Sequence, residues 1–131
     1  MYNASSSPQI RNSIVWDNGS TAIVNSNDSE PAFSYSLIEG GVPSGAVDDG
    51  NNLSTDPLFV TPINPASAPT TAGNLRLRVG SPAINAGNNA VASPALPATD
   101  RDGNPRIVGG AVDIGAYERL IFTVNLPLVR R

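Results

Sequence analysis

Residues 8–15 read PQIRNSIV, and residues 31–38, which begin 23 positions later, read PAFSYSLI. Both stretches open on proline and carry serine at their sixth position. Their third, seventh and eighth positions are apolar in both copies, and each stretch then runs into a turn, DNG at 17–19 or EGG at 39–41. Short apolar runs rich in β-branched and aromatic residues, bounded by Asn, Gly and Pro, are typical of strands. The chain therefore contains an internal strand-and-turn repeat.

A repeat length in the twenties with strand chemistry favours one rung of a parallel β-solenoid. In that fold the two stretches lie side by side as parallel strands, and amide side chains at the turns hydrogen-bond along the stack. The alternative is two unrelated strands of an antiparallel sandwich. The solenoid hypothesis assigns the amide stacking to Asn12, Asn18, Asn25 and Asn27.

The composition predicts an all-β domain. The chain has 131 residues, 40% of them hydrophobic, which is enough for one domain with a core. Its 12 Gly and 12 Pro are spread throughout, and no window keeps apolar residues at helical spacing for three turns, so helix should be scarce. Strands are expected within residues 9–16, 32–38, 58–60, 75–79 and 121–124.

The absence of several residue types restricts the chemistry. The sequence has no His, Cys or Lys, so imidazole and thiol catalysis and zinc–thiolate sites are excluded. A net charge of −3 disfavours a nucleic-acid partner, which requires clustered cations. No apolar run approaches the roughly 20 residues of a membrane span. We therefore expect a protein that is not an enzyme, does not bind nucleic acid and does not cross a membrane.

Two parts of the chain resemble a known family. Residues 1–18 look like one rung of the bacterial right-handed parallel β-helix surface proteins related to the polymorphic outer-membrane protein repeats. Four later blocks resemble, in this order, the choice-of-anchor Q region that closes such β-helices: DPLFV (56–60), LRL (75–77) with GSPAINAG (80–87), TDRDGNPR (99–106) and VDIGAYE (112–118).

The resemblance implies a fold and a location. The fold is a short right-handed parallel β-helix with rungs over residues 1–50, terminal rungs and a cap over residues 51–119, and an apolar tail strand over residues 120–131. The location is the bacterial cell surface or the secreted fraction, and the role is adhesive or structural. No catalytic residue is implied, because the family motifs are architectural.

One acidic motif suggests calcium. Asp100, Asp102 and Asn104 place oxygen ligands at alternate positions, and Gly103 permits a tight turn, as at the start of a calcium loop. The twelfth position of such a loop is Ala111, which supplies no carboxylate. The alternative is a turn in which these side chains cap backbone amides. Calcium is the one cofactor that the sequence suggests.

Two further acids form a candidate catalytic pair, Asp113 and Glu118, because solenoids include polysaccharide lyases and hydrolases. The structural alternative, which we favour, has Asp113 bonding backbone amides and Glu118 pairing with Arg106 or Arg119. Separately, four Asn-x-Ser sequons are candidate glycosylation sites: Asn3, Asn18, Asn27 and Asn52.

The sequence thus predicts a structural or adhesive module. Its partners are further copies of itself or further rungs of a longer parent, joined into fibres through an open strand edge or through the tail, and a surface polysaccharide is a second candidate partner. The tail, residues 120–131, either folds back as a cap or adds as a strand to a neighbour. The alternative function is a carbohydrate-binding or polysaccharide-degrading protein, a lyase or hydrolase remnant, with Trp16, Tyr2 and Tyr35 as stacking platforms.

Overall fold

The computed structural model describes residues 1–19, 22–91 and 95–120. Its regular elements are nine short strands and one 3₁₀ turn at Pro65–Ser67, so the all-β expectation is confirmed. The strand predicted at residues 121–124 lies outside the described residues. The strands are β1 (Tyr2–Ala4), β2 (Gln9–Arg11), β3 (Ile14–Val15), β4 (Val24–Ser26), β5 (Ala32–Ser34), β6 (Leu37–Ile38), β7 (Val47–Asp48), β8 (Phe59–Thr61) and β9 (Asn74–Leu77).

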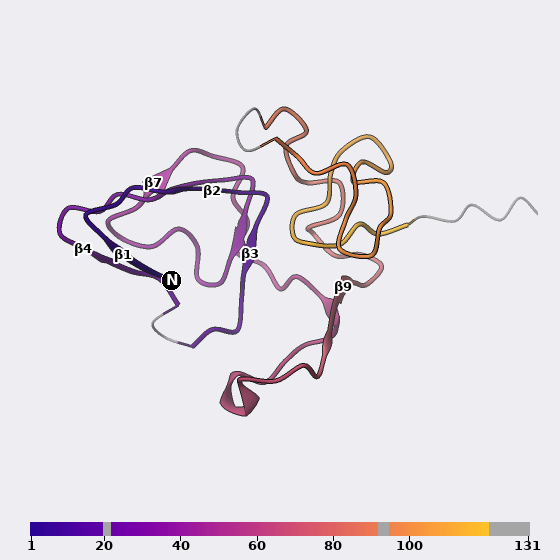
Figure 1. Ribbon diagram of the computed structural model, residues 1–131, viewed down its shortest axis with the longest axis horizontal. Helices are drawn as coiled ribbons and strands as arrows, with labels where there is room; N and C mark the ends of the chain where they lie inside the picture. Colours follow the sequence, from indigo (N-terminus) through magenta and orange to yellow (C-terminus); the bar gives the residue numbers. More distant parts are fainter. Residues whose placement is uncertain (20–21, 92–94, 121–131) are drawn as a thin grey trace, which may run out of the picture.

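The repeated stretches pair as parallel strands. β2 pairs with β5 so that Ile10 lies opposite Phe33, and β3 pairs with β6 so that Ile14 lies opposite Leu37. These partners are the ones that the 23-residue alignment matches, so the predicted register is confirmed and the two stretches are not antiparallel sandwich strands. β1 and β4 are also parallel. The three pairs lie together in the N-terminal part of the chain, at the left of Figure 1.

The repeat extends to the corners of the chain. Asn12 and Tyr35 occupy matching positions and have φ angles of 49° and 48°, and Asp17 and Gly40 have φ angles of 53° and 76°. Left-handed backbone at a corner lets the chain change direction between two short strands, and Asn, Asp and Gly adopt it most readily. Tyr35 adopts it although aromatic, and its backbone N–H donates to the Gly50 carbonyl at 3.1 Å.

The shared serine has a structural reason. The Ser36 hydroxyl is fully buried, accepts the Ser13 backbone N–H at 3.3 Å and donates to the Ser34 carbonyl at 3.0 Å. The Ser36 backbone N–H in turn donates to the Asn52 side chain at 3.0 Å. Side chains therefore link three successive passes of the chain at this corner, where strand pairing is interrupted.

Amide stacking occurs at one of the positions that we expected. Asn25 accepts a hydrogen bond from the Asn3 side chain at 2.9 Å and donates to the Gly45 carbonyl, which lies on the next pass. Asn18 instead donates to the Trp16 carbonyl, two residues away. Asn12 has a different partner again, Asn88.

The predicted right-handed parallel β-helix with a closing region is wrong. The strands form four separate small sheets, and β8 and β9 pair antiparallel. Parallel pairing ends at an isolated bridge between Leu37 and Leu53. Beyond β9 the described residues form no further strand, and antiparallel bridges join Thr99 to Pro105 and Val108 to Ala111. The described chain contains neither a closed sheet nor a solenoid.

The difference arises after Leu53. Up to that point parallel pairing tolerates unequal intervals, 23 residues from Gln9 to Ala32 and 15 residues from Ala32 to Val47. β8 and β9, by contrast, follow one another through residues 62–73 and pair antiparallel, which needs no crossover connection. Figure 1 shows this pair extending away from the parallel strands.

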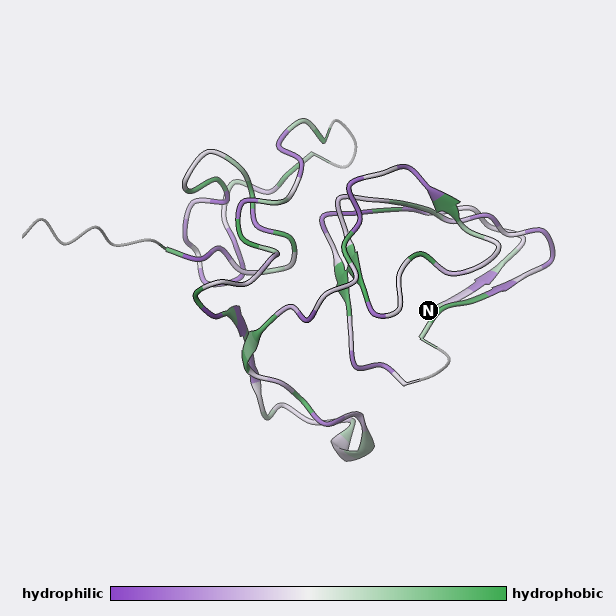
Figure 2. Cartoon of the chain, turned by 180° about the vertical axis from the view of Figure 1, so that it is seen from behind, coloured by the Kyte–Doolittle hydropathy of each residue, from purple (hydrophilic) through white to green (hydrophobic). Residues whose placement is uncertain are grey.

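One core joins the two halves of the chain. Leu37 of the parallel strands packs with Leu77 of β9 and with Ala83 and Ile114 of the C-terminal blocks. In Figure 2 the apolar segments are dispersed along all parts of the chain rather than concentrated in one element. The halves therefore depend on each other for burial of their apolar side chains.

The C-terminal block docks closely on the first repeat. The Gly115 N–H donates to the Asn12 carbonyl at 2.9 Å, and a side chain at Gly115 would approach Ile14 Cδ1 to 2.9 Å. The Asn12 side chain donates to the Asn88 carbonyl at 3.0 Å and accepts the Asn88 N–H at 2.8 Å. Asn12 thus joins the two halves rather than taking part in the predicted stack.

Replacing Ser36 tests the corner linkage. We expect Ser36→Ala to lower the free energy of unfolding by about 1–2 kcal/mol, because it leaves the Ser13 N–H without its buried acceptor. The matched control is Ser54→Ala, at an exposed serine. Urea denaturation of both variants measures the difference, and equal stability of the two variants would contradict the proposed linkage.

Candidate functional site

The candidate acidic residues form a buried network between two of the C-terminal blocks. Asp113 is 1% exposed and Glu118 is 7% exposed. Arg106 contacts both residues, with its Nη1 atom 2.5 Å from Glu118 Oε1 and its Nη2 atom 3.4 Å from the Asp113 carbonyl oxygen. Of the two partners that we expected for Glu118, the structure selects Arg106. The Arg106 Nη2 atom also donates to the Gly115 carbonyl at 2.5 Å, so this cation binds the block that contacts Asn12.

Asp113 and Glu118 act as acceptors for the backbone. The two carboxylate oxygens of Asp113 accept the N–H groups of Asn85 at 2.7 Å and Arg119 at 2.6 Å. The Glu118 carboxylate accepts the Asp113 N–H at 3.1 Å. A glycosidase pair must flank a substrate bond, which requires both carboxyl groups to be accessible. The contacts found here are those of the structural alternative.

Asp100, Asp102 and Asn104 form a tight turn. Asp100 Oδ1 accepts the N–H groups of Asp102 and Asn104, each at 2.8 Å, and Oδ2 accepts the Glu118 N–H at 2.9 Å. Asp102 points elsewhere and pairs with Arg76, with Nε–Oδ2 at 2.6 Å. The described chain holds no group of three or more acidic side chains arranged for a metal ion. Calcium binding stays a prediction, and the geometry is that of the turn.

The pKa values of the buried acids Glu118 and Asp100 shift in opposite directions. Burial raises the pKa of Glu118 to about 7, and the nearby Asp113 charge adds to this effect, whereas the Asp113 N–H and Arg106 oppose it. Burial alone would also raise the pKa of Asp100, but hydrogen bonds from Glu118 and Asn104 outweigh it and lower that pKa. The network therefore keeps Asp100 ionised and brings Glu118 close to protonation at neutral pH.

The four sequon asparagines lie in different environments. Asn18 and Asn27 are exposed. Asn3 is buried and donates to Asn25, and Asn52 donates to the Phe33 carbonyl at 2.8 Å. A glycan needs an accessible amide nitrogen, and the Asn18 nitrogen, although exposed, donates to the Trp16 carbonyl, so the geometry favours Asn27 among the four candidates.

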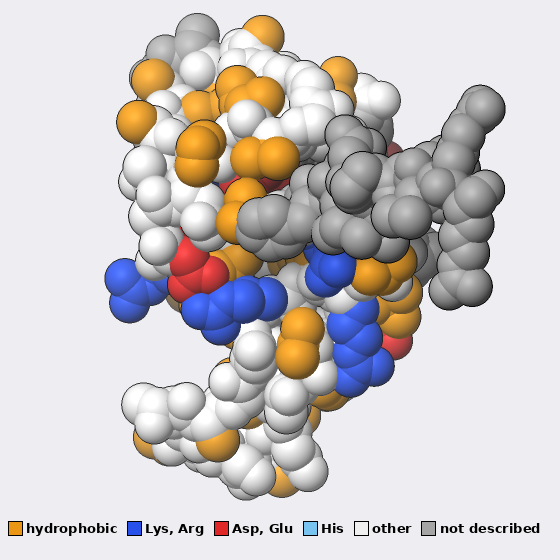
Figure 3. All heavy atoms as spheres, turned by 90° about the vertical axis from the view of Figure 1, so that its right-hand side faces the viewer, with side chains coloured by type: hydrophobic (Ala, Val, Ile, Leu, Met, Phe, Trp, Pro, Cys, Tyr) orange, Lys and Arg blue, Asp and Glu red, His pale blue; other side chains and the backbone are white. Residues whose placement is uncertain are grey.

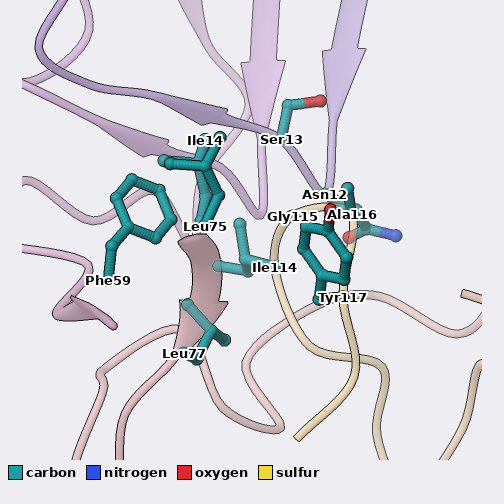
Figure 4. Close-up of a pocket in the computed structure, with 10 residues that line it drawn as sticks. All are labelled: Asn12, Ser13, Ile14, Phe59, Leu75, Leu77, Ile114, Gly115, Ala116 and Tyr117. Carbon is teal, nitrogen blue, oxygen red and sulfur yellow. The ribbon is translucent and has the colours of Figure 1, made fainter. Parts of the chain in front are cut away.

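The three aromatic candidates do not form a row. Tyr2 is 70% exposed, whereas Trp16 and Tyr35 are half-buried and Trp16 packs against the core. Trp16 lines a cavity of about 280 Å³ together with Asp17 and Asn18. A neighbouring cavity of about 360 Å³ has mainly apolar walls, and Figure 4 shows Phe59 and Tyr117 on opposite sides of it with Ile114 between them.

The arginines are largely engaged in internal contacts. Figure 3 shows basic side chains in a band across one face, with an acidic side chain among them. Arg76 pairs with Asp102 and lies 4.7 Å from the centre of the Tyr117 ring, and Arg78 donates to the Val60 carbonyl. The hydrogen bond with Asp102 raises the pKa of Arg76. No described helix is long and apolar enough to cross a membrane.

Sequence reasoning missed the most extensive contact of this region, between Asn12 and Asn88. The two residues are 76 positions apart, and no repeat or motif relates them. The only signal was the asparagine-rich run at residues 85–89, which does not specify a partner.

The raised pKa of Glu118 predicts a pH dependence. The ordinary pKa of a glutamate, 4.5, applies to the unfolded state, whereas the pKa of Glu118 in the folded state is about 7. Between these two pH values the folded state keeps a proton that the unfolded state releases. The free energy of unfolding should therefore fall by about 1–3 kcal/mol as the pH rises through this window, and level off above it. Urea denaturation across the window measures the slope. We expect Glu118→Gln to abolish it, and an unchanged slope in that variant would assign the effect to another group.

Searches against protein-family models, curated proteins and solved structures find no match to this chain. The resemblance of the four C-terminal blocks to a β-helix closing region therefore remains a prediction.

Proposed function

We propose that the chain is a non-catalytic structural module that joins further copies of itself through exposed strand edges, at the surface of a bacterial cell. The observation that supports this most is the sheet order β2–β5–β7, in which β2 and β7 are edge strands. An edge strand presents unpaired backbone groups in a regular row, which is a template for pairing with another chain.

The geometry of β2 indicates which backbone groups are available. The Ala32 N–H donates to the Pro8 carbonyl at 2.9 Å, and Gln9 lies opposite Ala32. In a parallel ladder this arrangement directs the N–H and carbonyl of Gln9 away from β5. Gln9 is exposed, and its outward backbone groups are the ones that we propose for the contact with a second copy.

The two edges are different surfaces. β2 belongs to the first pass of the chain and β7 to the third, and β5 lies between them. A contact from the β2 edge of one copy to the β7 edge of the next is head-to-tail, and such contacts extend into open fibres unless the rotation closes a ring. Val47 on β7 is 42% exposed and adds apolar area to this contact.

The acidic network supports the non-catalytic part of the proposal. Asp100, Asp113 and Glu118 are buried, and each accepts hydrogen bonds from the backbone. Groups that hold the fold in this way are not accessible to a polysaccharide.

A second candidate function is sugar binding, favoured by the cavity at Trp16. An aromatic ring beside the polar side chains of Asp17 and Asn18 offers both stacking and hydrogen bonding to a sugar ring. Trp16 is the only tryptophan of the chain, so its fluorescence would report an added oligosaccharide directly.

A proline at Gln9 tests the assembly proposal. Gln9→Pro removes the outward N–H while leaving the bond between Ala32 and Pro8 in place, and proline is tolerated at such edge positions. Light scattering over a range of concentrations should show the unmodified chain associating, and Gln9→Pro weakening the association at least tenfold. The matched control Gln9→Ala keeps the N–H and should associate normally. A chain that stays monomeric at millimolar concentration would show that the proposal is wrong.

A further inference from the structure

The corner that follows β3 contains the one Asn-Gly step of the sequence, Asn18–Gly19. Both residues are exposed, and so is Asp17 before them. Gly19 has a φ angle of 76°, and beyond its chain neighbours no atom of the described residues lies within 4 Å of the position that a Cβ would take. The backbone nitrogen of Gly19 is therefore open to a close approach from the side.

An asparagine side chain can react with the backbone nitrogen of the residue that follows it. The nitrogen attacks the side-chain carbonyl carbon and gives up its proton, and the carboxamide nitrogen leaves as ammonia, so that a five-membered succinimide ring is formed. Water then opens the ring at either of its two carbonyls, which leaves aspartate or isoaspartate. Glycine favours the attack most, because it has no Cβ to shield its nitrogen and its φ angle is free to change as the ring closes.

The Gly19 nitrogen is available for this attack. In the described part of the chain, no hydrogen bond joins the Gly19 N–H to an acceptor. Two Asp-Gly steps, which can form the same ring, are different. The Gly50 N–H donates to Asp48 Oδ1 at 2.9 Å, and the Gly103 N–H donates to the Asp100 carbonyl at 3.2 Å. These bonds hold the two nitrogens in place, whereas the Gly19 nitrogen is held by no such bond.

The Asn18 side chain makes one contact that opposes the reaction. Its Nδ2 atom donates to the Trp16 carbonyl at 2.9 Å, and this bond is exposed to water. An exposed hydrogen bond favours the bonded rotamer by no more than about tenfold. The carboxamide can therefore leave Trp16 and turn toward Gly19, and the cost to the rate is limited to a factor of this size.

We propose that Asn18 is a site of spontaneous deamidation, at which the chain converts its own amide into a carboxylate without an enzyme. The reaction consumes one water molecule and releases ammonia. A carboxylate cannot carry an N-linked glycan, so deamidation and glycosylation of this sequon exclude each other. The inference does not rest on assembly through β2 and β7.

The product adds a negative charge to a corner that already holds two acids. Asp17 precedes the site, and its N–H accepts no further partner than the Glu39 carboxylate, to which it donates at 2.9 Å. The carboxamide donor to Trp16 is lost at the same time. Because the chain gains one negative charge, anion exchange separates the deamidated chain from the original one.

Peptide mass spectrometry of the purified chain, after incubation at mildly alkaline pH, measures the reaction. Asn27 is exposed and is followed by Asp28, so it serves as a matched control in the same digest. We expect Asn18 to be converted at least about tenfold faster than Asn27, because only Asn18 precedes a glycine. Isoaspartate should form together with aspartate, since water opens the ring on both sides.

The variant Gly19→Ala tests the role of the nitrogen. Its Cβ shields the attacking atom, so conversion of Asn18 should be slowed at least about tenfold. Measuring the same variant in urea separates this effect from any change in folding, and the slowing should persist there.

Three outcomes would overturn the proposal. Equal rates at Asn18 and Asn27 would show that the step before Gly19 has no special reactivity. Aspartate without isoaspartate would show that water attacks the side chain directly. A rate in the folded chain more than about a hundredfold below the rate of the same chain unfolded in urea would show that the fold protects Asn18 and that reaction requires local opening.

Discussion

The junction at Asn12 is the constraint on which the rest of the structure depends. Asn12 has left-handed backbone, which turns the first repeat between β2 and β3. At this corner its carbonyl accepts the Gly115 N–H, and its side chain makes two hydrogen bonds to Asn88. Three bonds from one residue therefore hold a segment more than seventy residues away against the first strands. Without them the parallel strands would lack the C-terminal part of their core.

The buried charges support the same junction from the other side. Arg106 binds the Gly115 carbonyl, while the neighbouring Gly115 N–H is the group that reaches Asn12. The Glu118 carboxyl group contacts Arg106, and Asp113 holds the backbone of Asn85. A buried cation is stable only with such partners, because its removal from water is costly. The acids that a catalytic hypothesis would use are thus committed to the fold, and this favours a structural role.

The sequence predicted the parallel register for a local reason. Matching prolines, serines and apolar positions over eight residues determine which side chains of the two strands point inward and which residues lie opposite each other. A slip by one residue would place every side chain on the opposite face of the sheet. The same reasoning failed beyond Leu53, where four ordered blocks suggested further rungs. Those blocks form tight turns, an antiparallel pair and a buried ion pair, and similar short motifs serve either architecture. For Asp100 and Asp102 the sequence left two alternatives open, and the contacts with Glu118 and Arg76 come from partners distant in the chain.

By itself the sequence determined the all-β character, the scarcity of helix, the repeat between residues 8–15 and 31–38, and the lack of imidazole and thiol chemistry. These properties follow from composition and from spacing within a few residues. The tertiary structure alone decided that Asn12 meets Asn88, that Glu118 pairs with Arg106 rather than Arg119, and that an apolar cavity lies between β3 and β9. Such contacts join residues far apart in the chain. Their partners are selected by how the separate parts pack around a common core, which no local pattern encodes.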